Sequence, residues 1–222
     1  MRKLMTIAAI LVVCDAASLR AEESGPTVSL RVAYGLPGGK AADDLPLSEA
    51  ASRNVPLWLD VGYRVSAYIS AGVYASYGLV HMTAENTCTS SLTCSAKNAR
   101  LGVEGFYHLM PADLLDAYAG AGIGYEWMNF KVANPNDDSL DFGYRGFELN
   151  LHGGGDFSIM PGVTIGPFAT LSIGQYSSTW MSTSLNQDSS EWTSGTTISQ
   201  GIGDDKTLHY WFHFGVRATY NI

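Results

Sequence analysis

The sequence predicts an all-β protein, an eight-stranded antiparallel up-and-down β-barrel that crosses a membrane. Apolar side chains alternate with glycine or polar side chains in eight segments, and a period of two residues indicates a β-strand. Each segment reaches the ~9–11 residues of a tilted membrane-spanning strand. Charged residues make up only 15% of the chain, below the ~25% usual in soluble domains, whereas glycine is abundant at 24 residues.

Residues 1–21 have the pattern of a secretory signal peptide. Arg2 and Lys3 form a basic start, an apolar core from Met5 to Val13 follows, and small residues precede a cleavage site after Ser18 or Ala21. Removal of this segment takes away three of 13 basic and one of 21 acidic residues, which leaves a net charge near −10. Nucleic acid is excluded as a partner because it needs a basic face. A short polar segment at residues 22–27 then precedes a barrel at residues 28–222.

The eight expected strands follow one another along the chain with the apolar residues in one register. They are TVSLRVAYG (27–35), VPLWLDVGYR (55–64), AYISAGVYASYGLV (67–80), NARLGVEGFYHL (98–109), DAYAGAGIGYEWMNF (116–130), GFELNLHGGGDFSI (146–159), TIGPFATLSIGQY (164–176) and LHYWFHFGVRATYNI (208–222). The glycines of the fifth strand occupy the face opposite the apolar one, where we expect large side chains to need room.

The connections between these strands alternate in length. Short links are expected at residues 64–66, 110–115 and 160–162, and long polar links at residues 35–54, 80–98, 131–143 and 177–207. Outer-membrane barrels have short turns on the periplasmic side and long loops outside the cell. The pattern therefore places both chain ends on the periplasmic side.

The same alternation would suit a soluble eight-stranded barrel with its apolar face inward. Two features favour a face turned to lipid. The opposite face has no lysine within the strand cores, although a water-exposed face would carry interspersed lysine and glutamate. Large aromatic residues also gather near the strand ends, as at the two membrane interfaces. These expected interface aromatics are Tyr34, Tyr63, Tyr77, Tyr107, Tyr125, Trp127, Phe157, Tyr210 and Tyr220.

Charged residues on the opposite face are expected to form a network in the lumen. They are Arg31, Asp60, Arg64, Arg100, Glu104, Glu126, Glu148, Asp156 and Arg217. An eight-stranded interior is just wide enough for side chains to fill it, and an unpaired charge there would cost several kcal/mol. We therefore expect a packed ionic plug, with Arg100 bridging Glu104 or Glu126. The alternative is a gated pore in which these pairs exchange partners.

Cys88 and Cys94 lie in the polar segment ENTCTSSLTCSAKN and become the only cysteines once the signal peptide leaves. Export to an oxidising compartment favours a local disulfide between them. A zinc site would need more ligands than this segment offers, and we expect no metal site.

Segments such as LWLDVGYR, AGVYASYG and AYAGAGIGYEW resemble the small outer-membrane β-barrel family, which includes the opacity proteins and the barrel of outer membrane protein A. The resemblance covers residues 28–222. It implies a place in the bacterial outer membrane after export, contact with outer-membrane lipid and lipopolysaccharide, and insertion by the barrel-assembly machinery. It also implies surface-exposed loops, no cofactor and, in many members, no enzymatic activity.

The expected function is a structural or surface-interaction role with an unidentified surface ligand. One alternative is a narrow channel for ions or small solutes, and a second is a lipid-modifying enzyme. Barrel enzymes of that kind carry a His-x-Ser pair, which none of the five histidines here provides; His81 with Thr83 is the nearest match. Hydrogen-bonded lumen histidines are the simpler interpretation.

Overall fold

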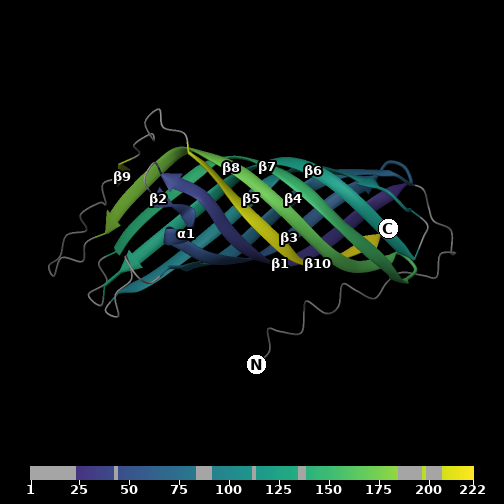
Figure 1. Ribbon diagram of the computed structural model, residues 1–222, viewed down its shortest axis with the longest axis horizontal. Coiled ribbons are helices and arrows are strands. Elements are labelled where there is room, and N and C mark those ends of the chain that lie inside the picture. The colour runs from purple at the N-terminus through teal and green to yellow at the C-terminus, as the bar shows by residue number, and fades with distance from the viewer. Residues whose placement is uncertain are drawn as a thin grey trace, which may run out of the picture.

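Eight long antiparallel strands form a closed ring in the computed structural model, which describes residues 24–42, 45–83, 92–111, 114–134, 139–184, 197–198 and 207–222. The strands are β1 (Gly25–Ala42), β3 (Ala51–Arg64), β4 (Ile69–Met82), β5 (Thr93–His108), β6 (Leu115–Ala133), β7 (Ser139–Met160), β8 (Val163–Ser184) and β10 (Leu208–Asn221). Each pairs with the next, and β10 pairs with both β8 and β1, so the sheet has no free edge (Figure 1). The predicted barrel is confirmed. Within the described residues, no helix is long and apolar enough to cross a membrane.

At the end of the barrel that carries the long connections, the strands extend further than predicted. Residues 131–143 were expected to form a long loop, but β6 and β7 stay paired as far as Ala133 and Ser139. β1 likewise continues to Ala42, and β8 continues to Ser184. Antiparallel pairing satisfies backbone hydrogen bonds whatever the side chains are, so the ladders continue beyond the point where apolar alternation ends.

The first long connection, predicted as a loop, contains two small elements. β2 (Leu45–Pro46) pairs with β1, and α1 (Leu47–Ala50) contacts β1 and β3. In the last connection, the two-residue strand β9 (Thr197–Ile198) pairs with β8. The segment with β2 and α1 thus folds back against the barrel at its long-loop end.

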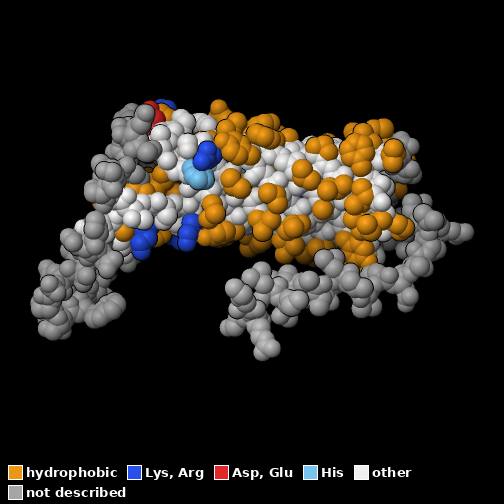
Figure 2. Space-filling model, turned by 90° about the horizontal axis from the view of Figure 1, so that it is seen from below, with side chains coloured by type: hydrophobic (Ala, Val, Ile, Leu, Met, Phe, Trp, Pro, Cys, Tyr) orange, Lys and Arg blue, Asp and Glu red, His pale blue; other side chains and the backbone are white. Residues whose placement is uncertain are grey.

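The outward face of the ring is an apolar band, seen as a broad orange surface in Figure 2. Aliphatic side chains on this face are about half exposed, such as Leu30 at 48% and Val103 at 51%. Gly102 of β5 and Gly120, Gly122 and Gly124 of β6 lie on the inner face. Gly102 of β5 pairs with Gly124 of β6, and a Cβ at either residue would overlap the hydroxyl of Tyr74. These glycines therefore make room for a large side chain in the lumen.

Candidate functional site in the barrel lumen

A buried ion cluster around Arg31 crosses the lumen at mid-height. The Arg31 side chain, 1% exposed, extends inward from β1 and donates to Asp60 on the neighbouring strand β3 at 2.6 Å. The same guanidinium also reaches both carboxylate oxygens of Glu104 on β5, at 2.9 and 2.8 Å. Two strands separate β1 from β5 in the ring, so this contact spans the interior. Fixed in this way, Arg31 ties three strands together.

A second cluster forms around Arg100 of β5. Its Nη2 lies 3.0 Å from Glu126, the residue directly opposite on β6, and its Nε lies 3.5 Å from Glu148 on β7. The predicted bridge from Arg100 to a carboxylate is therefore present, to Glu126. Nη1 of Arg100 also donates to the hydroxyl of Ser172 at 3.0 Å, across the lumen on β8. Arg100 is 2% exposed, so these partners replace water.

The carboxylates of the Arg100 cluster have further partners from distant strands. Glu126 contacts the Nε2 atom of His209 on β10 at 2.6 Å and accepts a hydrogen bond from Asn98. Glu148 accepts from the hydroxyl of Tyr74 on β4 at 2.8 Å and from Asn150 at 3.1 Å. Every charge in this cluster is hydrogen-bonded, as a buried charge requires.

A third pair lies nearer the short turns. Arg217 of β10 donates to Asp156 of β7, and its guanidinium stacks over the ring of Tyr118, 3.9 Å from the ring centre. At the mouth itself, Arg64 donates to Asp116 at 3.0 Å, and His108 contacts the same carboxylate at 2.7 Å. Asp116 was not among the predicted lumen charges, although it shares the inward register of Glu126 in the same strand.

Aromatic rings fill the space beside the Arg31 cluster. Trp58 packs edge-on against Phe168 at 5.9 Å between ring centres and against His213 at 5.0 Å. The Arg31 guanidinium lies 5.5 Å from the centre of the Trp58 ring. Buried aromatic rings and cations attract each other at such distances. The middle of the lumen is thus packed by both ions and rings.

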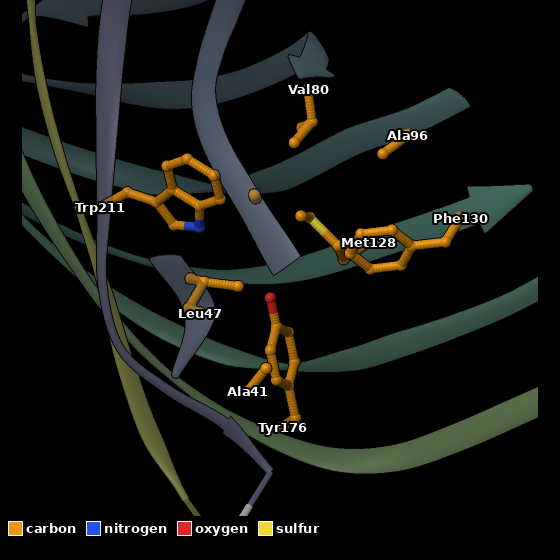
Figure 3. Packing of buried hydrophobic residues seen from close by; sticks show 9 residues of the cluster. Ala41, Leu47, Val80, Ala96, Met128, Phe130, Tyr176 and Trp211 are labelled. Atoms are coloured by element: carbon orange, nitrogen blue, oxygen red, sulfur yellow. The ribbon is translucent and has the colours of Figure 1, made fainter. Parts of the chain in front are cut away.

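The lumen toward the long loops is apolar, which the sequence-based prediction of a charged and polar filling did not include. Met128, Phe130, Tyr176 and Trp211 are each at most 2% exposed and line this part of the interior. Leu47 of α1 packs among them with no exposed surface, as the close view shows (Figure 3). The first connection therefore inserts an apolar side chain into the mouth. The alternation in the sequence already places these strand residues on the inward face, so their position in the lumen could have been predicted.

The predicted site residues take the following positions. Eight of the nine lumen charges are buried, and Arg64 is part-buried at the short-turn mouth. The predicted interface aromatics lie on the outward face, where Tyr63, Tyr77 and Tyr107 are about half exposed. Cys94 is in a disulfide, whereas Cys88 lies outside the described residues, so the pairing between them stays a prediction. The predicted signal peptide also lies outside the described residues.

A small polar cavity lies among the charges near the short turns. Its volume is about 40 Å³, and Asp60, Arg64, His108, Asp156 and Arg217 contribute to its lining. A cavity of this size holds a few water molecules at most. The unpartnered carboxylate oxygens of Asp60 and Asp156 give such waters acceptors. The space suits hydration of the network rather than passage of a solute.

No protein-family model matches the chain, and no curated protein sequence matches it. Solved structures do match. A major outer membrane protein from Thermus thermophilus superposes with a TM-score of 0.62 at 11% identity, over 89% of this chain and 99% of that one. Neisserial surface protein A superposes with a TM-score of 0.52 at 11% identity, over 90% of this chain and 100% of that one. The chain therefore has the fold of the small eight-stranded outer-membrane β-barrels.

Proposed function

We propose that the protein is an outer-membrane barrel with a sealed lumen, which serves a structural or surface-interaction role. The location is supported by the closed ring, the apolar band around it, and a fold shared with outer-membrane proteins. In lipid, a closed barrel is the sheet form that leaves no backbone group without a partner. The orientation follows from the link lengths, with the long connections outside the cell.

The observation that carries the sealed lumen is the set of contacts between strands that are not neighbours. Arg31 of β1 reaches Glu104 of β5, Arg100 of β5 reaches Ser172 of β8, and Glu126 of β6 reaches His209 of β10. Tyr74 of β4 reaches Glu148 of β7 in the same way. These side chains bridge the interior in several directions, and Leu47 fills the apolar end. These contacts among the described residues support a lumen without a free path for solutes.

A narrow channel is the second candidate, and one geometric feature favours it. Arg100 lies between two carboxylates, 3.0 Å from Glu126 and 3.5 Å from Glu148, so a small movement would exchange its principal partner. Conductance of purified protein in planar bilayers separates the candidates. We expect no stepwise conductance above the bare bilayer, and regular open steps would favour the channel.

Lipid-modifying activity receives less support from the described histidines. His108, His152, His209 and His213 lie on the lumen side, away from lipid, and hydrogen bonds or ring contacts hold them there. His81 lies on the outward face near the long loops. Mass analysis of outer-membrane lipid A with and without the protein tests this candidate, and we expect the same species in both samples.

The location and orientation are tested together in cells. We expect recovery in the outer-membrane fraction and a gel mobility that changes on boiling, because a closed barrel resists detergent until heated. An epitope tag inserted at Ser91, between β4 and β5, should bind antibody on intact cells. Recovery as a soluble periplasmic protein would contradict the location, and labelling only after lysis would contradict the orientation.

A further inference from the structure

Basic side chains in the described part of the chain fall into two sets. Four arginines belong to the lumen, and the other basic residues that the structure describes lie on exposed surface at the long-loop end. That second set is Lys40, Arg53, Lys97, Lys131 and Arg145. The protein as a whole is acidic, with a net charge of −8. A cluster of exposed basic side chains at one end of the barrel is therefore not what the overall composition would predict.

Four of these cations, with His81, form one patch on the outer wall from β3 to β7. Arg53 of β3 lies directly opposite His81 of β4. Lys97 of β5 lies opposite Leu79 and Asn129, and is therefore one diagonal step from both His81 and Lys131. Arg145 of β7 completes the set, which is called the basic patch below. Figure 2 shows basic and histidine side chains where the apolar band ends, near the loops.

The basic patch begins where the apolar band stops. Arg53 is the next outward residue after Val55, His81 follows Leu79, and Arg145 precedes Phe147. Outward residues two apart are about 6.6 Å from each other along a strand. Phe147 packs on Tyr125 at 5.1 Å, within the aromatic border of the band. In the proposed orientation the cations therefore lie beside and beyond the aromatic border, where lipid headgroups are expected.

The patch lacks enough anions of its own. In the part of the chain that the structure describes, Arg53 and Lys97 contact no carboxylate, and Lys131 lies 3.9 Å from Asp141 in an exposed pair. Among the described residues, the side chain of Arg145 donates to the hydroxyl of Ser178 at 3.2 Å and contacts no carboxylate. Like charges on adjacent strands repel each other, and a single exposed ion pair offsets little of this repulsion. An external anion at this height would remove the repulsion.

We propose that the basic patch binds the phosphate groups of a phosphorylated glycolipid in the outer leaflet. The patch crosses five strands, about 19 Å at the usual strand spacing, which is wide enough for more than one phosphate. Exposed Ser95 and Asn129 lie among the cations and offer partners to sugar hydroxyls. Leu79 and Val55, just below, give the acyl chains an apolar contact. The inference rests on the proposed outer-membrane location with the long loops outward.

The test measures lipid binding to the folded mature protein in neutral detergent by native mass spectrometry. Three lipids are titrated: bisphosphorylated lipid A, the same lipid A without phosphates, and phosphatidylglycerol. We expect the phosphorylated glycolipid to bind at least about tenfold more tightly than either other lipid, since each basic group near a charged lipid surface contributes substantially to the binding free energy. Equal binding of the dephosphorylated form would overturn the role of phosphate. Equal binding of phosphatidylglycerol would overturn the assignment to a glycolipid.

Two triple variants locate the site. R53Q/K97Q/R145Q removes three charges and should weaken lipid A binding about 10- to 100-fold, whereas R53K/K97R/R145K keeps the charges and should bind like the wild type. Unchanged binding by the neutral variant, with its boiling-dependent gel shift intact, would show that the patch is not the site. Lipid binding in detergent does not depend on whether the lumen is sealed or on the location in the cell. A negative result would therefore overturn the lipid site without contradicting the proposed function, which conductance and cell fractionation test.

Discussion

Replacement of Arg100 by methionine is expected to destabilise the barrel strongly. Arg100 is 2% exposed and lies 3.0 Å from Glu126 and 3.5 Å from Glu148, each no more than 4% exposed. After the change, Glu126 keeps His209 and Asn98, whereas Glu148 keeps only uncharged partners, Tyr74 and Asn150. Loss of one partner from a buried pair costs roughly 3–5 kcal/mol, because the other charge stays buried.

The assay is a double-mutant cycle on urea unfolding in detergent, with Arg100→Met, Glu126→Gln and the combined variant. We expect the combined variant to be more stable than the sum of the single changes predicts, because Glu126→Gln removes one of the two buried carboxylates that have lost their arginine partner. Lys131→Met is the matched control: it lies 3.9 Å from Asp141 in an exposed pair, so the loss should stay below about 1 kcal/mol. Additivity of Arg100 and Glu126 within about 0.5 kcal/mol would refute the reasoning.

Two further predictions concern the packing of the lumen. Gly124→Ala should lower the free energy of unfolding by about 1–3 kcal/mol, because its Cβ would overlap the Tyr74 hydroxyl. Gly105→Ala, whose Cβ would have its closest neighbour at 3.7 Å, should leave the free energy of unfolding nearly unchanged. Equal effects of the two changes in urea unfolding would contradict this account of the glycines. In a background without the native cysteines, Leu47→Cys should resist a water-soluble maleimide while exposed Glu49→Cys reacts; rapid labelling of both would show that α1 does not close the mouth.

The strand order and the direct cross-strand contacts could be predicted from the sequence because both follow from period-two alternation. Arg100 and Glu126 face inward on consecutive strands, and the structure places them directly opposite each other. The contact of Arg31 with Glu104 could not be predicted in the same way. It joins strands far apart in the ring, and its existence depends on the stagger of the closed sheet, which alternation does not specify.

The apolar end of the lumen shows a different limit. Parity places Met128 and Trp211 inside, but their apolar character gave no reason to expect a partner from a loop. α1 has only four residues, too few to show a helical period, so the position of Leu47 was beyond sequence reasoning. The strand ends beyond residue 131 were missed for a related reason, since backbone pairing continues there without an apolar pattern.

Closure of the sheet between β1 and β10 is the central claim, because both the lumen and the outer band depend on it. Val32 and Val216 lie directly opposite across this seam, at a spacing that a disulfide can bridge. In a background without the native cysteines, oxidised V32C/V216C should form the cross-link in nearly all molecules. V32C/Y220C, displaced by four residues or about 13 Å, should not form it. Absence of the first cross-link, or equal yields of both, would contradict the closed barrel.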